Sequence, residues 1–438
     1  MPERLAQAAA GIPHLETVRH LGTVTQVVGT VVEVRGLRAP IGDLCWIDGG
    51  PARPRLAAEV VGFRDGTLLL MPFGELTGVG AGNRVHGAGA ALQVPVGPAL
   101  LGRVIDAMGR PLDDGPPLPT HTTVARYAAP PPALTRQRIT EPQQTGVKAI
   151  DAFVTCAKGQ RVGIFAGSGV GKSVLLGMIT RHTDADVNVV ALIGERGREV
   201  REFLEEDLGP EGLQRTVVVV ATSDQSPVLR VRAAEMAMSI GEWFREHNQN
   251  VMMVMDSVTR YAMAWREIGL AVGEPPTTKG YTPSVFAELA RLLERAGTST
   301  VNAMTAFFTV LVEGDDLNDP VADAVRSIAD GHVVLSRDLA RSGHYPAIDV
   351  MGSVSRLMSA VTAPEHRDAA SRLLGMMKLL EDNEDLISIG AYRPGGNPRL
   401  DRAVRLREAV EAFLRQDLGD HVPMQRTLAE LTALAARD

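Results

Sequence analysis

The sequence contains few cysteines, few aromatic residues and no excess of positive charge. Its two cysteines, Cys45 and Cys156, are too few for a disulfide scaffold and fit a reducing compartment. Aromatic residues make up 4% of the chain and the formal net charge is −7, so the basic face and stacking residues typical of nucleic-acid-binding proteins are missing. No apolar run approaches the roughly 18–20 residues that span a bilayer, and the first residues lack a secretory pattern. We therefore expect a cytoplasmic protein that does not bind nucleic acid.

The changing pattern along the 438 residues predicts four successive parts. Residues 1–20 form an N-terminal segment, either a short amphipathic helix or a loose chain. Residues 21–92 contain short β-type runs between glycines, which is typical of a small antiparallel β-barrel. Residues 93–360 alternate apolar strands with helical stretches, which predicts an α/β domain with a mostly parallel sheet covered on both faces. Residues 361–438 are helical and charged, and predict a C-terminal helical domain. The strands expected in the α/β domain include Arg161–Ala166, Val187–Ile193, Thr216–Ala221, Val251–Met255, Met304–Leu311 and Val333–Leu335.

A glycine-rich segment follows the first of these α/β strands and matches a phosphate-binding loop (P-loop) in a relaxed form, with alanine where the strict pattern has glycine. Glycines let backbone N–H groups turn toward phosphate oxygens, and the N-terminus of the next helix adds a positive dipole. Lys172 would contact the β- and γ-phosphates, and the Ser173 hydroxyl would bind Mg²⁺. A glycine-rich turn without a ligand is the alternative, which the Lys-Ser pair and the flanking strand and helix disfavour. The segment reads Ala166-Gly167-Ser168-Gly169-Val170-Gly171-Lys172-Ser173, and its residues from Gly167 onward are the predicted nucleotide contacts.

Acidic residues follow two other predicted strands. Asp256 comes directly after Val251–Met255, and beside a P-loop we interpret it as the Walker B carboxylate that helps to hold Mg²⁺. Hydrolysis also requires a group that orients the attacking water. Glu195 and Glu199 follow Val187–Ile193, at the strand end where ligands gather in open α/β sheets. The residues alone do not choose between these two glutamates, and an ordinary salt-bridge role is open for each.

Together these segments resemble the hexameric ATPases of the rotary ATP synthase family, and within it the protein-export ATPases of flagella and type III secretion systems. The resemblance runs from about residue 22 to 415 and rests on several long motifs in order. Those motifs are Gly159–Ser173, Ile193–Val200, Asp256–Ala264, Gly273–Tyr281, Leu311–Asp316 and Gly343–Asp349.

The resemblance implies a role for each candidate residue. It makes Glu195 the catalytic glutamate, Arg196 a phosphate-facing arginine and Glu199 a second acid near the metal. Tyr345, which alone would be interpreted as a core residue, is implied to pack on adenine. Arg356 ends the motif Ser353-Val354-Ser355-Arg356, which carries the family's arginine finger. Such a finger reaches into a neighbouring subunit's site and is worth ~10³–10⁵ in rate.

The same resemblance implies an ATP- and Mg²⁺-dependent enzyme that works as a homo-oligomer, a hexameric ring at the cytoplasmic face of the inner membrane. The implied partners are a peripheral stator-like regulator, a central stalk-like export protein, export chaperones and substrates, and the export gate in the membrane. The sequence departs from the family at Leu418, where a second aromatic residue often lies beside the base, and in residues 297–302, which lack extra glycines.

Three other functions share parts of this pattern. A non-catalytic ring subunit would lack the catalytic glutamate, so Glu195 argues against it. The catalytic subunit of a proton-translocating ATP synthase is disfavoured by the motifs Gly194–Val200 and Gly280–Phe286 and by the expectation of no strongly acidic helix-turn segment in the C-terminal part. An RNA-translocating hexamer is disfavoured by the net charge of −7 and by the absence of an aromatic and basic RNA site.

Overall fold

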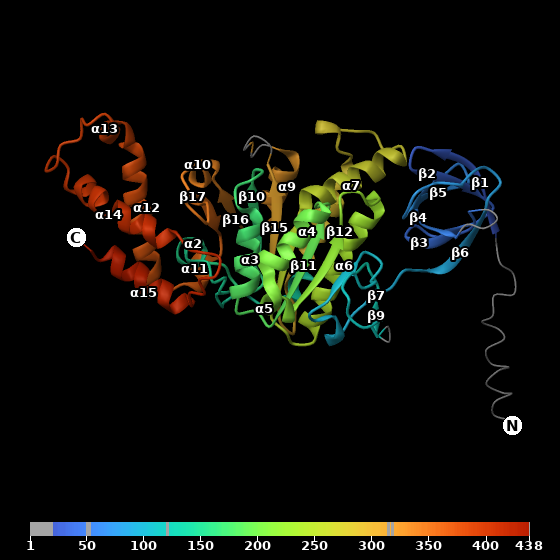
Figure 1. Ribbon diagram of the computed structural model, residues 1–438, viewed down its shortest axis with the longest axis horizontal. Coiled ribbons are helices and arrows are strands. Elements are labelled where there is room, and N and C mark those ends of the chain that lie inside the picture. The colour runs from blue at the N-terminus through green and yellow to red at the C-terminus, as the bar shows by residue number, and fades with distance from the viewer. Residues whose placement is uncertain (1–20, 50–53, 120–121, 313–315, 317–318, 438) are drawn as a thin grey trace, which may run out of the picture. The chain divides into compact units, whose positions relative to one another are not determined.

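The computed structural model (Figure 1) describes residues 21–49, 54–119, 122–312, 316 and 319–437. The helix considered for residues 1–20 lies outside this range. The chain forms two compact units, one of residues up to 92 together with 268–274, the other of residues 93–267 and 275–438. Within the described part of the chain, every helix is too short or too polar to cross a bilayer.

The first unit contains a closed six-stranded barrel, which confirms the predicted β-barrel. Its inward-facing side chains, among them Val32, Val34 and Leu70, are fully buried in one apolar cluster. The Asp65-Gly66 turn has positive φ at both central residues, 50° and 74°, the geometry that a two-residue hairpin requires. In spatial order the strands are β1 (Leu21–Val28), β2 (Val31–Arg35), β5 (Thr67–Pro72), β4 (Leu56–Arg64), β3 (Asp43–Ile47) and β6 (Arg84–Ala91), which pairs again with β1.

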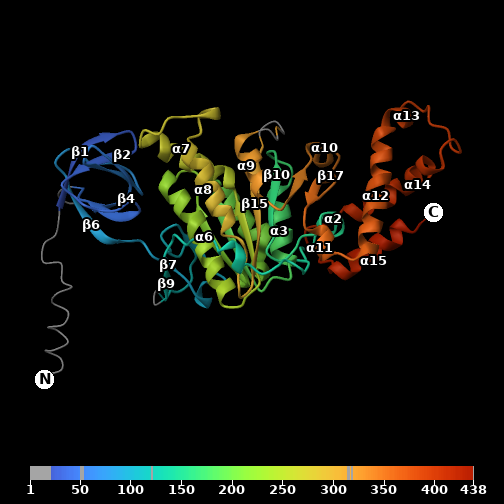
Figure 2. The ribbon, with the colours of Figure 1, turned by 180° about the vertical axis from the view of Figure 1, so that it is seen from behind.

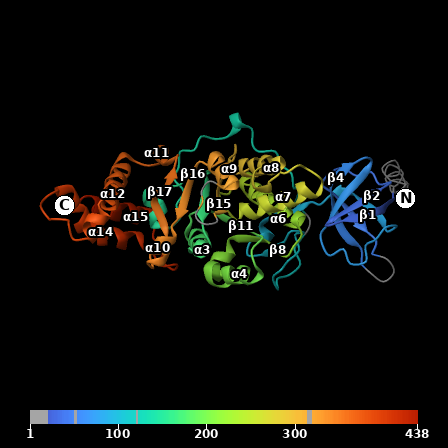
Figure 3. The ribbon, with the colours of Figure 1, turned by 90° about the horizontal axis from the view of Figure 1, so that it is seen from above.

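The second unit is built on one mostly parallel sheet, as predicted (Figure 3). In spatial order its strands are β17 (Ile348–Ser355), β16 (Gly331–Leu335), β10 (Arg161–Ala166), β15 (Ala303–Leu311), β13 (Val251–Asp256), β11 (Val187–Ile193), β12 (Thr216–Ala221) and β8 (Val104–Asp106). Among the strands of the described residues, β17 and the two-residue β14 (Gly297–Thr298) are the ones that pair antiparallel in it. The edge strands β8 and β17 were not among the predicted strands, because β8 has three residues and polar residues interrupt β17. A separate short pair joins β7 (Val94–Pro95) to β9 (Thr123–Val124).

Helices cover both faces of this sheet (Figures 1 and 2). On one face, Val190 and Leu192 share a core with α3 (Lys172–His182). On the other, Gly241 of α6 (Pro227–Glu246) lies against Met253. The remaining helices of this part are α2 (Lys148–Phe153), α4 (Gly197–Glu202), a π-helical turn (Phe203–Leu208), α5 (Gly209–Gln214), α7 (Val258–Ala271), α8 (Pro283–Glu294), α9 (Pro320–Ile328), α10 (Arg337–Arg341) and α11 (Met358–Val361).

The C-terminal helices are α12 (Pro364–Asp382), α13 (Glu384–Ser388), α14 (Pro398–Leu414) and α15 (Met424–Ala435), as the helical pattern predicted. Their apolar faces share the core that also contains α2, and Phe413 meets Phe153 edge to face at 6.2 Å. The expectation of no acidic helix-turn segment was wrong. Glu381 and Asp382 end α12, and Glu384 and Asp385 begin α13, with Asn383 between the two helices. Acids at helix ends are solvated and give no periodic signal in the sequence.

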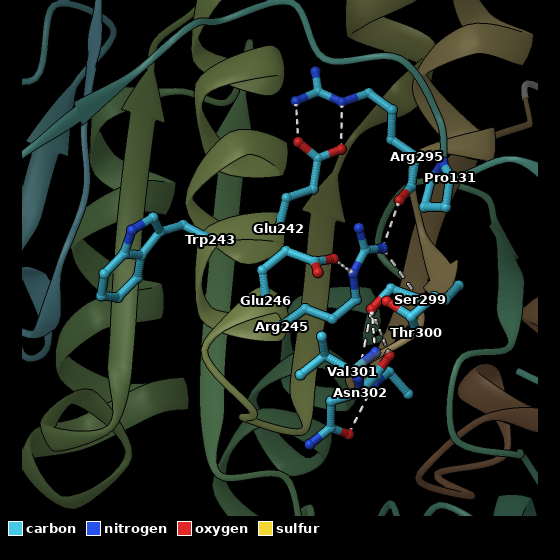
Figure 4. Close-up of polar contacts among 12 residues, drawn as sticks. Pro131, Glu242, Trp243, Arg245, Glu246, Arg295, Ser299, Thr300, Val301 and Asn302 are labelled. Atoms are coloured by element: carbon cyan, nitrogen blue, oxygen red, sulfur yellow. Dashed lines mark hydrogen bonds and ion pairs between the residues drawn. The ribbon is translucent and has the colours of Figure 1, made fainter. Parts of the chain in front are cut away.

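The amino ends of the strands are held by buried arginines (Figure 4). Arg295 forms a two-pronged ion pair with Glu242, at 2.7 and 2.8 Å, and its side chain is only 3% exposed. Arg245 donates to the carbonyl oxygens of Arg295 and Gly297. These contacts fix the segment that leads from α8 into residues 297–302, at the sheet edge opposite to the P-loop.

Candidate functional site

The P-loop connects β10 to α3 at the carboxyl edge of the sheet. Gly169 and Gly171 have φ of 77° and 86°, a left-handed conformation that favours glycine. Val170 points down into the apolar core, whereas Ser168 and Gly169 are exposed at the crest of the loop. The loop is therefore anchored from below and presents backbone and small side chains to solvent, as an anion-binding strand-to-helix turn requires.

Lys172, the first residue of α3, lies between two carboxylates from neighbouring strands. Its Nζ donates to Asp256 Oδ1 at 2.6 Å and to Glu195 Oε1 at 3.3 Å. Burial by itself lowers the pKa of Lys172, but the charges of Asp256 and then Glu195 outweigh it, so the pKa is raised overall. The lysine is held as a cation at the point where phosphate is predicted to bind.

Asp256 ends β13 and is 4% exposed at its side chain. The hydroxyl of Thr309, on the adjacent strand β15, donates to the same Oδ1 at 2.7 Å. A carboxylate oxygen that already accepts a fixed hydrogen bond has its orientation set before any ligand arrives. Thr309 was not among the predicted site residues, because a threonine inside an apolar strand gives no functional signal in the sequence.

Glu195 follows β11 through Gly194, whose φ of 72° turns the chain sharply. A β-carbon on Gly194 would lie 2.8 Å from Cβ of Arg260, so this close approach requires glycine. Burial, followed by the charge of Asp256, raises the pKa of Glu195 to about 7 in spite of Lys172. A hydrogen bond from Glu195 lowers the pKa of Glu199, so Glu195 is the glutamate of this pair that takes up a proton first.

Arg196 lies at the N-terminus of α4, and its side chain is 77% exposed. Its guanidinium pairs with Glu199 Oε1 at 3.6 Å. The side chain thus extends into solvent beside the two glutamates, and its predicted contact with phosphate stays a prediction.

Tyr345 lies next to the P-loop although it is far away in sequence. Its ring atoms Cε1 and Cδ1 are 3.2 and 3.3 Å from the position that a β-carbon on Gly171 would take. The residue is 44% exposed, so it is not the buried core tyrosine that the sequence alone suggested. An exposed aromatic face beside a phosphate loop is suitably placed to stack on a nucleotide base.

Arg356 lies at the other end of the strands. Its backbone N–H donates to Asp330 O, and its guanidinium donates to Arg326 O at 3.3 Å. The preceding residue Ser355 is in register, through β16, with Val162 near the amino end of β10. The P-loop starts only after Ala166, and the stretch from Val162 to Ala166 spans about 13 Å at ~3.3 Å per residue. Arg356 is therefore remote from the P-loop of its own chain.

The structure thus brings together Lys172, Glu195, Glu199 and Asp256, with Tyr345 beside the loop and Arg356 apart. The hydroxyl of Ser173 and the carboxylates of Asp256 and Glu199 are hard oxygen donors, the kind that Mg²⁺ prefers. The predicted metal residues therefore have suitable chemistry for that ion. These features define a protein of the P-loop nucleotide-binding class, with acidic side chains beside the loop.

Comparison with known proteins finds relatives over nearly the whole chain. Family models match for the ATP synthase alpha/beta family, beta-barrel domain at residues 24–89 and nucleotide-binding domain at 146–355, and for the T3SS EscN ATPase C-terminal domain at 362–433. The chain is 50% identical over 425 residues to the flagellum-specific ATP synthase of Bacillus subtilis, with 97% of each chain covered. It is 48% identical over 416 residues to the type 3 secretion system ATPase of Xanthomonas euvesicatoria, with 95% of this chain and 94% of that protein covered.

A solved structure extends this likeness to three dimensions. The assembled ATPase EscN of the enteropathogenic E. coli type III secretion system aligns with a TM-score of 0.88 and 43% identity, covering 95% of this chain and 100% of that chain. This chain belongs to the ATP synthase alpha/beta family, within the group of flagellum-specific ATP synthases and type 3 secretion system ATPases, and it is an ATP hydrolase.

Proposed function

We propose that this chain forms a homo-hexameric ring that hydrolyses ATP to energise protein export through a flagellar or type III secretion apparatus. The similarity to export ATPases over nearly its full length supports this function. We further propose that residues 21–92, 93–360 and 361–438 form three separate domains, and that each has its own role in the ring. The solved relatives support an assembly: one is an assembled ATPase and another is in complex with its central stalk.

The phosphates of ATP would bind the backbone of Gly167 to Ser173, with Lys172 on the β- and γ-phosphates. Ser173, Asp256 and Glu199 would hold Mg²⁺, which would supply positive charge to offset that of the phosphates. The hydrogen bond from Thr309 keeps Asp256 in place for this role. Tyr345 would stack on adenine beside the loop.

Glu195 is the group that we propose to orient and polarise the attacking water. It lies within hydrogen-bond reach of Lys172, which places it beside the predicted γ-phosphate position. Its pKa of about 7 lies near neutral pH, where a carboxylate is most effective at accepting a proton from water. Arg196 would complete the contacts to phosphate.

The position of Arg356 is the observation that carries the ring proposal. It lies at the end of the sheet away from its own P-loop, so it can act as an arginine finger only in the site of another subunit. A finger given in trans stabilises the charge that develops on the transferred phosphoryl group. Hydrolysis would then require assembly.

Mixed rings test this directly. Arg356→Ala and Glu195→Gln rings should each be nearly inactive. When the two variants are unfolded, mixed in equal amounts and reassembled, about a quarter of interfaces should combine an intact Glu195 with an intact Arg356, since each interface is head-to-tail. ATPase activity should therefore return. Arg341→Ala, which removes an exposed arginine from α10, is the control and should remain active.

Full ATPase activity of homomeric Arg356→Ala rings would contradict the role of Arg356 as an arginine finger. Mixed rings that demonstrably contain both variants but remain inactive would mean that Arg356 acts in the site of its own subunit. For the remaining partners we propose a peripheral stator-like regulator, export chaperones and substrates, and the export gate. With these partners the ring would lie at the cytoplasmic face of the inner membrane.

A further inference from the structure

Gln416 is a buried glutamine that joins three parts of the second unit. It follows α14 and is 5% exposed. Its Oε1 accepts from the backbone N–H of Lys148 at 2.8 Å. Its Nε2 donates to the carbonyl oxygens of Gly146 and Asp420, each at 2.8 Å. The amide therefore uses both of its donors and its acceptor on backbone groups, a fixed arrangement that costs free energy to disturb.

The backbone of Gln416 makes a fourth contact, and this one reaches the site. Its N–H donates to Tyr345 O at 3.0 Å. Tyr345 in turn lies over Gly171 of the P-loop. A continuous chain of contacts thus leads from the C-terminal helices through Gln416 to the aromatic ring beside the loop.

We propose that Gln416 is a positioning residue that holds Tyr345 against the P-loop and thereby sets how tightly the nucleotide base binds. The inference rests on the proposed role of Tyr345 as the base platform. It also gives the C-terminal helices a means to control nucleotide affinity: a shift of α14 relative to α2 strains the amide of Gln416 and moves the carbonyl of Tyr345. The contact with Gln416 makes Tyr345 more rigid. This rigidity supports base binding in a chain that has Leu418 where a second aromatic residue is usual in the family.

Gln416 could also have a purely structural role, in which it only connects two parts of the chain. Gln144 makes such a connection and therefore serves as a matched control. Gln144 Oε1 accepts from the N–H of Met424 at 2.8 Å, and its Nε2 donates to His182 O at 3.3 Å. It therefore also ties the segment before α2 to the C-terminal helices, but it makes no contact with Tyr345.

The test separates base binding from phosphate binding in the full-length protein. Gln416→Met keeps the side-chain length but removes its three hydrogen bonds, and Gln416→Glu keeps only the acceptor for Lys148. For each variant, KM for ATP, kcat and the inhibition constant of Mg²⁺-tripolyphosphate, which has no base, are measured. Both variants should raise KM for ATP about tenfold, the size of effect that losing buried hydrogen bonds produces. The value of kcat and the inhibition by tripolyphosphate should stay within about twofold.

Gln144→Met should change none of these values, and Tyr345→Ala should reproduce the rise in KM. If Tyr345→Ala raises KM but both Gln416 variants do not, the positioning role is wrong while the proposed function stands. If the Gln416 variants lose ATP binding and tripolyphosphate binding equally, the substitutions disturb the whole nucleotide site and not base binding alone. This result would overturn the inference. An unchanged KM in Tyr345→Ala would instead overturn the base platform itself.

Discussion

Lys172 Nζ lies 2.6 Å from Asp256 Oδ1 and 3.3 Å from Glu195 Oε1. The ammonium of Lys172 thus pairs with two carboxylates in a largely buried site, where these two acids would otherwise repel each other. The anions raise the pKa of Lys172 despite its burial, so the lysine is charged at neutral pH. A phosphate group that binds here meets a cation already in position, but it must compete with two acids for it.

Replacing Lys172 with alanine should abolish nucleotide binding. The loop would lose its only described ammonium, and Asp256 and Glu195 would then repel an incoming triphosphate across a short distance. Isothermal titration with Mg²⁺-ATP measures this. Lys158→Ala, which breaks the exposed pair with Glu141 at the base of the sheet, should bind ATP normally. Tight ATP binding by Lys172→Ala would remove the P-loop assignment.

Glu195→Gln should retain ATP binding and lose nearly all turnover, because the amide cannot accept a proton from water. The wild-type pH profile offers an independent check. Burial raises the pKa of Glu195 to about 7, so the carboxyl is protonated and inactive below that pH. The value of kcat/KM, which reports on the free enzyme, should therefore rise with pH and level off above about 7. A profile that is flat from pH 5 to 8, or near-normal turnover of Glu195→Gln, would move the role to Glu199.

Thr309→Val should lower the affinity of the enzyme for Mg²⁺ without unfolding the protein. The change is nearly isosteric, but it removes the 2.7 Å hydrogen bond that orients Asp256. Loss of such a supporting bond typically costs 10–100-fold in metal affinity or activity, so the Mg²⁺ concentration for half-maximal ATPase activity should rise about tenfold.

The control is Thr305→Val on the same strand. Thr305 is equally buried but accepts from the N–H of Gly159 at the opposite end of the sheet. The variant Thr305→Val should leave the Mg²⁺ concentration for half-maximal ATPase activity unchanged. Equal effects of the two variants would mean that the strand, and not the bond to Asp256, is responsible.

Much of this architecture could be predicted because it repeats local patterns. Apolar runs such as Val187–Ile193 became buried parallel strands, and the Lys172-Ser173 pair after a glycine-rich turn marked the site. What could not be predicted depends on pairing across the chain. Thr309 acquires meaning only when β15 lies beside β13, and the remoteness of Arg356 from its own P-loop follows from strand register. Neither relation leaves a trace in the sequence around the residue.

The ion pair between Glu242 and Arg295 should matter for stability and not for chemistry. Arg295 is 3% exposed and also donates to Ser239 Oγ at 2.8 Å, so removing Glu242 leaves a buried and unpaired guanidinium. Breaking such a pair typically costs about 3–5 kcal/mol. Glu242→Leu should lower the free energy of unfolding by that amount, measured by urea denaturation followed by circular dichroism.

The double variant Glu242→Leu with Arg295→Met should recover much of this loss, because two apolar side chains need no partner in the interior. Glu381→Gln, in an exposed pair with Lys378, should leave stability nearly unchanged, since surface pairs contribute little. If the double variant is as unstable as Glu242→Leu, the cost comes from lost packing around α6. If both are as stable as the wild type, the pair is solvated and does not anchor the amino edge of the sheet.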